Sequence, residues 1–99
     1  EVVFSDVVQE LVDEINKRGS YPIRIACAEP YIVNVKNVRA VSGKNIDAVA
    51  NEIVTAEVMC TAVGVNVLPF IAPAIAAGVK ARADAGVMEP INIVICENM

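Results

Sequence analysis

The chain has 99 residues, a length that predicts one small domain burying about 65% of its unfolded surface. Hydrophobic residues make up 56% of the sequence and aromatic residues only 4%, so the core must be aliphatic, which suits a parallel sheet buried on both faces. The net charge is −4, and without a basic stripe to neutralise phosphates the composition argues against nucleic acid as a partner.

The cysteines Cys27, Cys60 and Cys96 are widely spaced, and the chain has no histidine. Without paired cysteines or histidine, the sequence predicts no metal site. Two of the three lie in apolar strand patterns, where cysteine usually behaves as a small hydrophobic residue. No secretory leader is recognisable, so we expect a reduced, cytoplasmic protein. The missing histidine also removes the commonest general acid or base.

The first predicted elements are a short apolar strand over Glu1 to Ser5 and an amphipathic helix. The helix is indicated by apolar residues that share one helical face: Val7, Val8, Leu11, Val12 and Ile15. Acidic residues precede Lys17 and Arg18, an order that suits the helix dipole and allows i,i+4 pairs. Gly19 is then a natural residue to end the helix.

A β-hairpin is predicted next. Apolar residues alternate on both sides of a turn at Ala28-Glu29-Pro30, and they are Tyr21, Ile23, Ile25, Tyr31, Val33 and Val35. Val38 to Val41 is predicted as the next strand of the main sheet. Asn45 is expected to cap a short helix, whose apolar face consists of Ile46, Val49, Ala50 and Ile53.

The stretch from Glu57 to Arg82 contains the predicted central strand and the longest predicted helix. It predicts a buried strand at Val58 to Thr61, a turn of small residues, and a long apolar helix from Val67 to Ala83. A strand that leads into a glycine turn before a helix presents backbone N–H groups to a ligand in α/β proteins. A small molecule is therefore expected at the carboxyl end of this strand.

The same stretch has no charge between Glu57 and Lys80, and an uncharged run of this length can mark a membrane helix. Membrane spans are continuous helices, whereas this run is interrupted by Gly64, Asn66, Pro69, Pro73 and Gly78. The sequence therefore favours a core strand and helix. Ala83 to Pro90 is predicted as a loop and Ile91 to Cys96 as another buried strand, so strands and helices alternate. This order predicts an α/β fold with right-handed crossovers and a mostly parallel sheet with flanking helices.

Asp6 ends the first strand and opens the first helix. In dinucleotide-binding units an acidic residue about 20 residues after a G-x-G-x-x-G motif bonds the adenosine ribose, but this chain does not contain those glycines. The alternative is structural, since Asp6 with Gln9 forms an aspartate variant of the capping-box pattern.

Two further segments are candidates for a ligand site. Ala62, Val63 and Gly64 follow the central strand and allow a ligand to approach the backbone closely, although a tight strand–helix connection explains them equally well. Glu97 and Asn98 follow the last strand, where they could reach a ligand or could simply begin a loop.

Several motifs together resemble a known family. They are Phe4-Ser5-Asp6, Arg18-Gly19-Ser20-Tyr21, Thr61-Ala62-Val63-Gly64, Ile71-Ala72-Pro73, and the stretch from Pro90 to Cys96-Glu97-Asn98-Met99. In this order they are similar to the N-terminal cofactor domain of the mannitol-1-phosphate 5-dehydrogenase family, within the polyol-specific long-chain dehydrogenases.

The resemblance implies an NAD-dependent hydride transfer between mannitol 1-phosphate and fructose 6-phosphate. It implies that Asp6 holds the adenosine ribose diol and that Ala62, Val63 and Gly64 form the turn near the dinucleotide. Glu97 and Asn98 match the segment that approaches the nicotinamide and the substrate. No catalytic residue is implied in this chain, because the family's catalytic residues lie in a downstream helical domain.

On this interpretation residues 1–99 are a partial NAD-binding Rossmann-type domain, without its first strand and Gly-rich loop and without the C-terminal catalytic domain. Two strands would then have unpaired edges, and we expect such a fragment to self-associate. Two alternatives stay open: a free-standing α/β interaction module that binds no nucleotide, and the cofactor domain of another NAD-linked polyol dehydrogenase.

Overall fold

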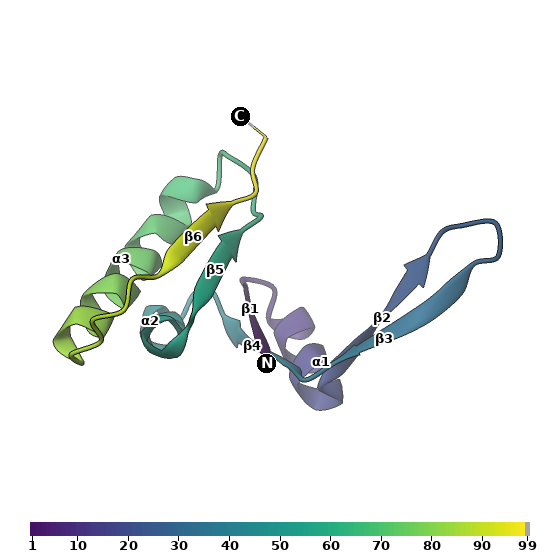
Figure 1. Cartoon of the computed structure of the whole chain (residues 1–99), viewed down its shortest axis with the longest axis horizontal. Helices are drawn as coiled ribbons and strands as arrows, with labels where there is room; N and C mark the ends of the chain where they lie inside the picture. The colour runs from purple at the N-terminus through teal and green to yellow at the C-terminus, as the bar shows by residue number, and fades with distance from the viewer. Residues whose placement is uncertain (99) are drawn as a thin grey trace. The chain divides into compact units, whose positions relative to one another are not determined.

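Strands and helices alternate along the chain except for one hairpin (Figure 1). The structure, a computed structural model, describes residues 1–98. In chain order the elements are β1 (Val2–Asp6), α1 (Gln9–Arg18), β2 (Ser20–Ile25), β3 (Tyr31–Lys36), β4 (Val38–Ser42), α2 (Ile46–Thr55), β5 (Val58–Thr61), α3 (Leu68–Asp84) and β6 (Asn92–Ile95). The predicted α/β class and order of elements are confirmed, and the ends of the long helix differ from the prediction by one residue.

The strands form three two-stranded sheets. β1 pairs with β4 and β5 pairs with β6, both in parallel, whereas β2 and β3 form the predicted antiparallel hairpin. Among the described residues β1 and β5 each have a single partner strand, so each keeps the unpaired edge that the sequence predicts. The chain divides into two compact units, Glu1–Lys44 and Asn45–Met99, which we describe separately.

In the first unit, helix α1 begins later than its apolar pattern predicts. Val7 and Val8 precede the helix and are exposed, and only Val12 of the predicted apolar face is fully buried. The predicted end is confirmed, because Gly19 has a φ of 64° and donates its N–H to the carbonyl of Ile15 at 2.7 Å. The left-handed conformation explains why glycine stands there.

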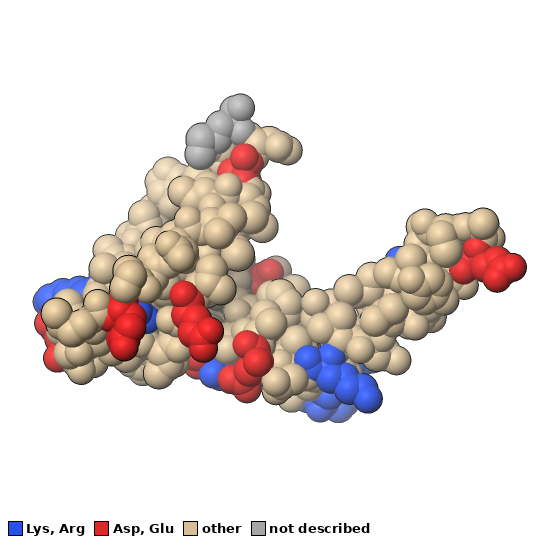
Figure 2. All heavy atoms as spheres, viewed as in Figure 1, with Lys and Arg blue, Asp and Glu red and all other residues tan. Residues whose placement is uncertain are grey.

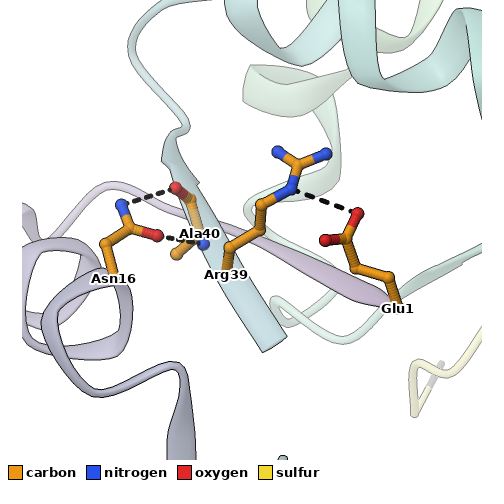
Figure 3. A network of polar contacts seen from close by, with 4 residues as sticks. All are labelled: Glu1, Asn16, Arg39 and Ala40. Atoms are coloured by element: carbon orange, nitrogen blue, oxygen red, sulfur yellow. Dashed lines mark hydrogen bonds and ion pairs between the residues drawn. The ribbon is translucent and has the colours of Figure 1, made fainter. Parts of the chain in front are cut away.

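Helix α1 is tied to the edge of β4 by one side chain (Figure 3). Asn16 donates from Nδ2 to the carbonyl of Ala40 at 2.9 Å and accepts the Ala40 N–H on Oδ1 at 2.8 Å. The side-chain amide thus presents the same donor and acceptor that a neighbouring strand would present. Arg39 of the same strand forms an ion pair at 3.2 Å with Glu1, the residue before β1. This pair is half-exposed and contributes little stability.

The hairpin of β2 and β3 projects from the rest of its unit in Figure 1. The register pairs Ser20 with Lys36 at the root and Ile25 with Tyr31 near the turn. At the root the ring of Tyr21 packs edge to face against Phe4 of β1, with 5.8 Å between the ring centroids. The register confirms the predicted turn. The contact between Tyr21 and Phe4 attaches the hairpin to the first unit at its root.

In the second unit, α2 and α3 pack closely against each other. The predicted cap of α2 is confirmed, because Asn45 accepts the N–H of Ala48 at 3.1 Å. The buried positions of α3 recur every fourth residue at Ala74, Gly78 and Arg82. A Cβ at Gly78 would lie 2.6 Å from Cβ of Ile53 on α2, so only glycine permits this helix–helix distance.

The guanidinium of Arg82 satisfies the carboxyl end of α2. Arg82 is 6% exposed, and its Nη1 donates to the carbonyls of Ile53, Val54 and Ala56 at 2.9 to 3.1 Å. Its Nη2 donates to the carbonyl of Glu89 at 2.8 Å. The last carbonyls of a helix have no partner within the helix, and α2 has no basic residue in its own last turn. A residue of α3 therefore supplies both the donors and the positive charge.

Two sequence-based expectations about burial are wrong. The strands β5 and β6 were expected to be buried, yet Val58 is 56% exposed and every residue of β6 is exposed. A sheet is buried on both faces only when it is wide and covered on both sides, and this sheet has two strands. The three cysteines Cys27, Cys60 and Cys96 are also all exposed. The prediction that two of them act as small hydrophobic core residues is therefore wrong.

Within residues 1–98 no helix is both long enough and apolar enough to cross a membrane. The uncharged run between Glu57 and Lys80 is divided between β5, a turn and α3, with Pro69 in the first turn of the helix and Pro73 inside it. The predicted order of strand, turn and helix in that run is confirmed, whereas the predicted burial of the strand is wrong, since Val58 is 56% exposed.

Candidate functional site

The polar residues singled out by the sequence lie at the carboxyl ends of two parallel strand pairs, one in each unit. Asp6 is the last residue of β1 and lies opposite Ser42 of β4. In the second unit Thr61 ends β5 opposite Ile95 of β6, and Glu97 follows two residues later. The carboxyl end of parallel strands is where open α/β sheets bind ligands.

Asp6 organises the turn between β1 and α1. Its Oδ1 accepts the N–H of Val8 at 2.8 Å. The predicted capping box is not formed, because the side chain of Gln9 donates to Asp13 at 2.8 Å and the helix cap is Val8, without a side-chain bond. Asp6 still belongs to the strand, so its carboxylate closes a turn over two residues instead of reaching the third helical position.

Gly43 supports the backbone of Asp6 and was missed in the sequence. Its N–H donates to the Asp6 carbonyl at 2.8 Å. A Cβ at Gly43 would lie 3.2 Å from Oγ of Ser5 and 3.4 Å from the carbonyl carbon of Asp6. The signal for this contact was a glycine placed directly after a strand, which often marks a close approach of two backbones.

The free oxygen of Asp6 fits a ribose diol. Asp6 is half-buried at the end of β1, and its Oδ2 makes no hydrogen bond or ion pair with the described residues. A carboxylate with one oxygen fixed by the backbone and the other unbonded can accept hydroxyl hydrogen bonds without reorganising. The donor set at this strand end is thus compatible with the adenosine ribose of a dinucleotide.

In the second unit Glu97 closes the turn that follows β5. Its carboxylate accepts the N–H of Val63 at 3.1 Å on Oε2 and that of Gly64 at 2.8 Å on Oε1. Gly64 has a φ of 91°, a conformation that turns successive N–H groups toward one side and forms an anion-binding concavity. The N–H groups that the sequence assigned to a ligand are thus bound by a carboxylate of the chain itself.

This geometry lowers the pKa of Glu97. The N–H of Val63 has the largest effect, partial desolvation raises the pKa in opposition, and the N–H of Gly64 lowers it further. The hydroxyl of Thr61 adds a smaller lowering, although Thr61 Oγ1 makes no hydrogen bond of normal geometry. We regard Thr61 as a nearby dipole and the two amides as the real partners, since both have bonding distances. Glu97 is therefore held as the anion.

The sequence placed Thr61 at the end of the central strand, and the structure confirms that it ends β5, where it is 5% exposed. Its carbonyl accepts the N–H of Cys96 at 2.9 Å, which continues the strand pairing toward Glu97. Ala62 and Asn98 are exposed. The structure thus brings Val63, Gly64 and Glu97 into direct contact.

A second concavity lies at the opposite end of β5. The residues that line it include Glu57, Arg82, Val87 and Pro90. The Arg82 guanidinium already bonds four carbonyls, and the concavity lies at the amino end of the strand. Within residues 1–98 no cluster of three or more histidine, cysteine or acidic side chains could hold a metal ion. The candidate sites are therefore the carboxyl end of β1 in the first unit and, separately, the carboxyl ends of β5 and β6 in the second unit.

Comparison with known proteins shows which family the chain resembles. The family model described as the mannitol dehydrogenase Rossmann domain matches residues 1–99. The chain is 44% identical over 99 residues to a mannitol-1-phosphate 5-dehydrogenase of Brevibacillus brevis, covering 100% of this chain and 25% of that protein. It is 42% identical over 99 residues to the enzyme of the same name from Lactiplantibacillus plantarum, covering 99% of this chain and 26% of the relative. For the Lactococcus lactis enzyme of that name the identity is 39% over 100 residues, covering 100% of this chain and 26% of the relative. The chain thus spans about a quarter of the length of these relatives.

Proposed function

The chain belongs to the mannitol dehydrogenase Rossmann-domain family, and on this premise we propose that it is part of the NAD-binding domain of a mannitol-1-phosphate 5-dehydrogenase. The full-length enzyme would interconvert mannitol 1-phosphate and fructose 6-phosphate by hydride transfer. The observation that carries the proposal is Asp6, half-buried at the end of β1 with an unbonded carboxylate oxygen. When bound, NAD supplies the hydride acceptor, and the protein binds and orients it.

In this proposal Asp6 selects the cofactor. Its Oδ1 is held by the Val8 N–H, and Oδ2 accepts hydrogen bonds from the ribose diol. The 2′-phosphate of NADP would face a fixed negative charge at the same place, so the carboxylate favours NAD over NADP. Gly43, which bonds the Asp6 backbone, keeps the carboxylate at the end of the strand.

The turn of Ala62, Val63 and Gly64 is a second proposed binding site, which belongs to the second unit. Because Glu97 uses both carboxylate oxygens on Val63 and Gly64, we assign Glu97 to positioning the turn rather than to bonding the dinucleotide. Asn98 is the next residue and is exposed, so its amide is available to a ligand that lies against the turn. No residue of this chain is assigned a catalytic step.

The cofactor preference tests the role of Asp6 in the full-length enzyme. Asp6→Ala should raise KM for NAD more than tenfold while activity with NADP holds or improves, since removing the charge removes both the hydroxyl acceptor and the repulsion. Asp6→Asn is the matched variant, because it keeps the size and an acceptor but not the charge. An equal loss with both cofactors would mean that Asp6 acts mainly through its turn with Val8.

The 99-residue chain alone is predicted to have no dehydrogenase activity. It contains no histidine and no G-x-G-x-x-G motif, and the relatives it matches are about four times as long. Absorbance at 340 nm would follow NADH formation from mannitol 1-phosphate, with the full-length enzyme as the positive control. Turnover by the purified chain would refute the proposal that the chemistry lies elsewhere in the polypeptide.

A further inference from the structure

The turns that follow β1 and β4 are built in the same way, at the same end of one sheet. At the end of β1, Oδ1 of Asp6 accepts the N–H of Val8 at 2.8 Å. At the end of β4, Oγ of Ser42 accepts the N–H of Lys44 at 3.3 Å. In both turns the last side chain of a strand bonds the backbone two residues later, and this bond fixes the side chain at the strand end.

Asp6 and Ser42 lie next to each other across the two strands. They are paired residues of the parallel ladder, and both are half-buried. Paired residues of neighbouring strands direct their side chains to the same face of a sheet. The N–H of Gly43 donates to the carbonyl of Asp6 at 2.8 Å, which continues the ladder beyond this pair and holds the two strand ends in register. The carboxylate and the hydroxyl therefore share one face at the carboxyl end of the sheet.

The two side chains leave complementary hydrogen-bonding groups unused. Oδ2 of Asp6 is an unbonded acceptor, and the hydroxyl hydrogen of Ser42 donates to none of the described residues. A serine hydroxyl that accepts one hydrogen bond still has its O–H to donate. A ligand group that uses both must donate and accept at once. An alcohol hydroxyl does so, whereas the oxygens of an ionised phosphate mainly accept.

On the face shown in Figure 2, charged side chains form small separate groups among uncharged atoms. Recognition of a ribose there depends on individual polar groups. We propose that Ser42 is a further specificity-determining residue of the cofactor site, and that its hydroxyl donates to the same ribose 2′-hydroxyl that donates to Asp6. This inference rests on the proposed function, which places the adenosine ribose at Asp6. Asp6 repels a 2′-phosphate, and Ser42 adds affinity for the 2′-hydroxyl itself.

Calorimetric titration of the full-length enzyme with NAD and with 2′-deoxy-NAD tests the contact without turnover. Ser42→Ala removes the hydroxyl and should raise the Kd for NAD about fivefold, the loss expected for one hydrogen bond between neutral groups. The Kd for 2′-deoxy-NAD should be the same in Ser42→Ala and in the unsubstituted enzyme, because this ligand lacks the hydroxyl that Ser42 binds. Equal losses with both ligands, or no loss with NAD, would overturn the proposal.

Two matched variants control for effects on the fold. Ser42→Thr keeps the hydroxyl and suits a strand, so its Kd for NAD should stay within about twofold of the unsubstituted value. Ser20→Ala makes the same substitution at the start of β2, away from the carboxyl ends of β1 and β4, and should leave both Kd values unchanged. A loss in Ser42→Thr or in Ser20→Ala as large as that in Ser42→Ala would contradict the contact.

The double variant Asp6→Ala/Ser42→Ala tests whether the two side chains bind one hydroxyl. Its Kd for NAD should rise by less than the product of the two single changes, because the second substitution removes a contact that the first has already weakened. Independent effects that multiply would contradict a shared hydroxyl. If Asp6→Ala leaves NAD binding unchanged, the proposed function fails and this inference fails with it. A clear effect of Asp6→Ala without any effect of Ser42→Ala would remove this inference alone.

Discussion

Asn16 in the first unit and Arg82 in the second both satisfy backbone groups that regular structure leaves open, but with different chemistry. Asn16 meets the N–H and the carbonyl of Ala40, one donor and one acceptor. Arg82 meets four carbonyls, which are all acceptors. A neutral amide matches the mixed edge of a strand, whereas a cation matches the end of a helix. Each side chain thus has the hydrogen-bonding character of the backbone that it meets.

Glu97 extends the comparison to the opposite charge. The turn after β5 presents two N–H groups to Glu97, and the two carboxylate oxygens of Glu97 accept both hydrogen bonds. Arg82 is buried and Glu97 lies at the surface, so the two contacts should differ widely in their contribution to stability. The comparison therefore predicts an order of effects from Arg82 through Asn16 to Glu97.

The largest effect is expected at Arg82. Arg82→Met keeps the length of the side chain but leaves the carbonyls of Val54, Ala56 and Glu89 without the guanidinium donor, while the Ile53 carbonyl retains only the Ala56 N–H. This should lower the free energy of unfolding by about 3 kcal/mol or more. Arg82→Lys retains the charge and up to three donors and should recover part of the loss. Urea unfolding of the chain measures both. Equal and small losses in the two variants would show that water replaces the guanidinium.

A smaller effect is expected at Asn16. Asn16→Leu removes both hydrogen bonds to Ala40 and should cost about 2 kcal/mol in urea unfolding. Asn16→Asp keeps the acceptor but not the donor, so the Ala40 amide should stay protected from hydrogen exchange in Asn16→Asp and lose protection in Asn16→Leu. Gln9→Ala on the same helix, which removes only an exposed bond to Asp13, is the control. If Ala40 exchanges equally in all variants, another group covers this edge.

The smallest effect is expected at Glu97, and it depends on pH. Because the pKa of Glu97 is lowered below its usual 4.5 by the two amides, the contact is fully present above pH 4.5 and is lost as the pH falls through the lowered value. The amide NMR shift of Gly64 should follow this titration in the native chain. In Glu97→Gln the shift should be independent of pH, since glutamine has one acceptor and no charge. A Gly64 shift that titrates identically in both proteins would assign the change to another group.

Local patterns in the sequence predicted the elements and several of their ends, although α1 begins later than its apolar pattern predicts. Gly19 ends α1, Asn45 caps α2, and Ala28-Glu29-Pro30 turns the hairpin, because each of these features depends on residues within one or two turns of chain. The order of strands and helices gave the α/β class for the same reason. The position of Asp6 at the end of a strand was also predictable, since alternating elements place strand ends at loops.

The polar contacts between distant residues could not be predicted. Asn16 and Ala40 are 24 residues apart, Arg82 and Ile53 are 29 apart, and Glu97 and Gly64 are 33 apart. In the sequence each of these side chains looks like a solvated residue on a helix or loop. The backbone groups that it meets are fixed only when the elements pack, so neither spacing nor composition carries the information.

The Asn16 contact makes the two edges of the β1–β4 sheet unequal as places where a further strand could pair. On the outer side of β4 the N–H and carbonyl of Ala40 are occupied by Asn16, and the N–H of Val38 donates to the carbonyl of Gly19 at 3.4 Å. An incoming strand would therefore have to displace Asn16 to pair along the middle of β4, whereas the free edge of β1, whose sole partner strand among residues 1–98 is β4, has no such side chain bonded to it in the described contacts. Addition of a further strand, whether from the rest of a polypeptide or from another molecule, is thus favoured at β1 and disfavoured at β4.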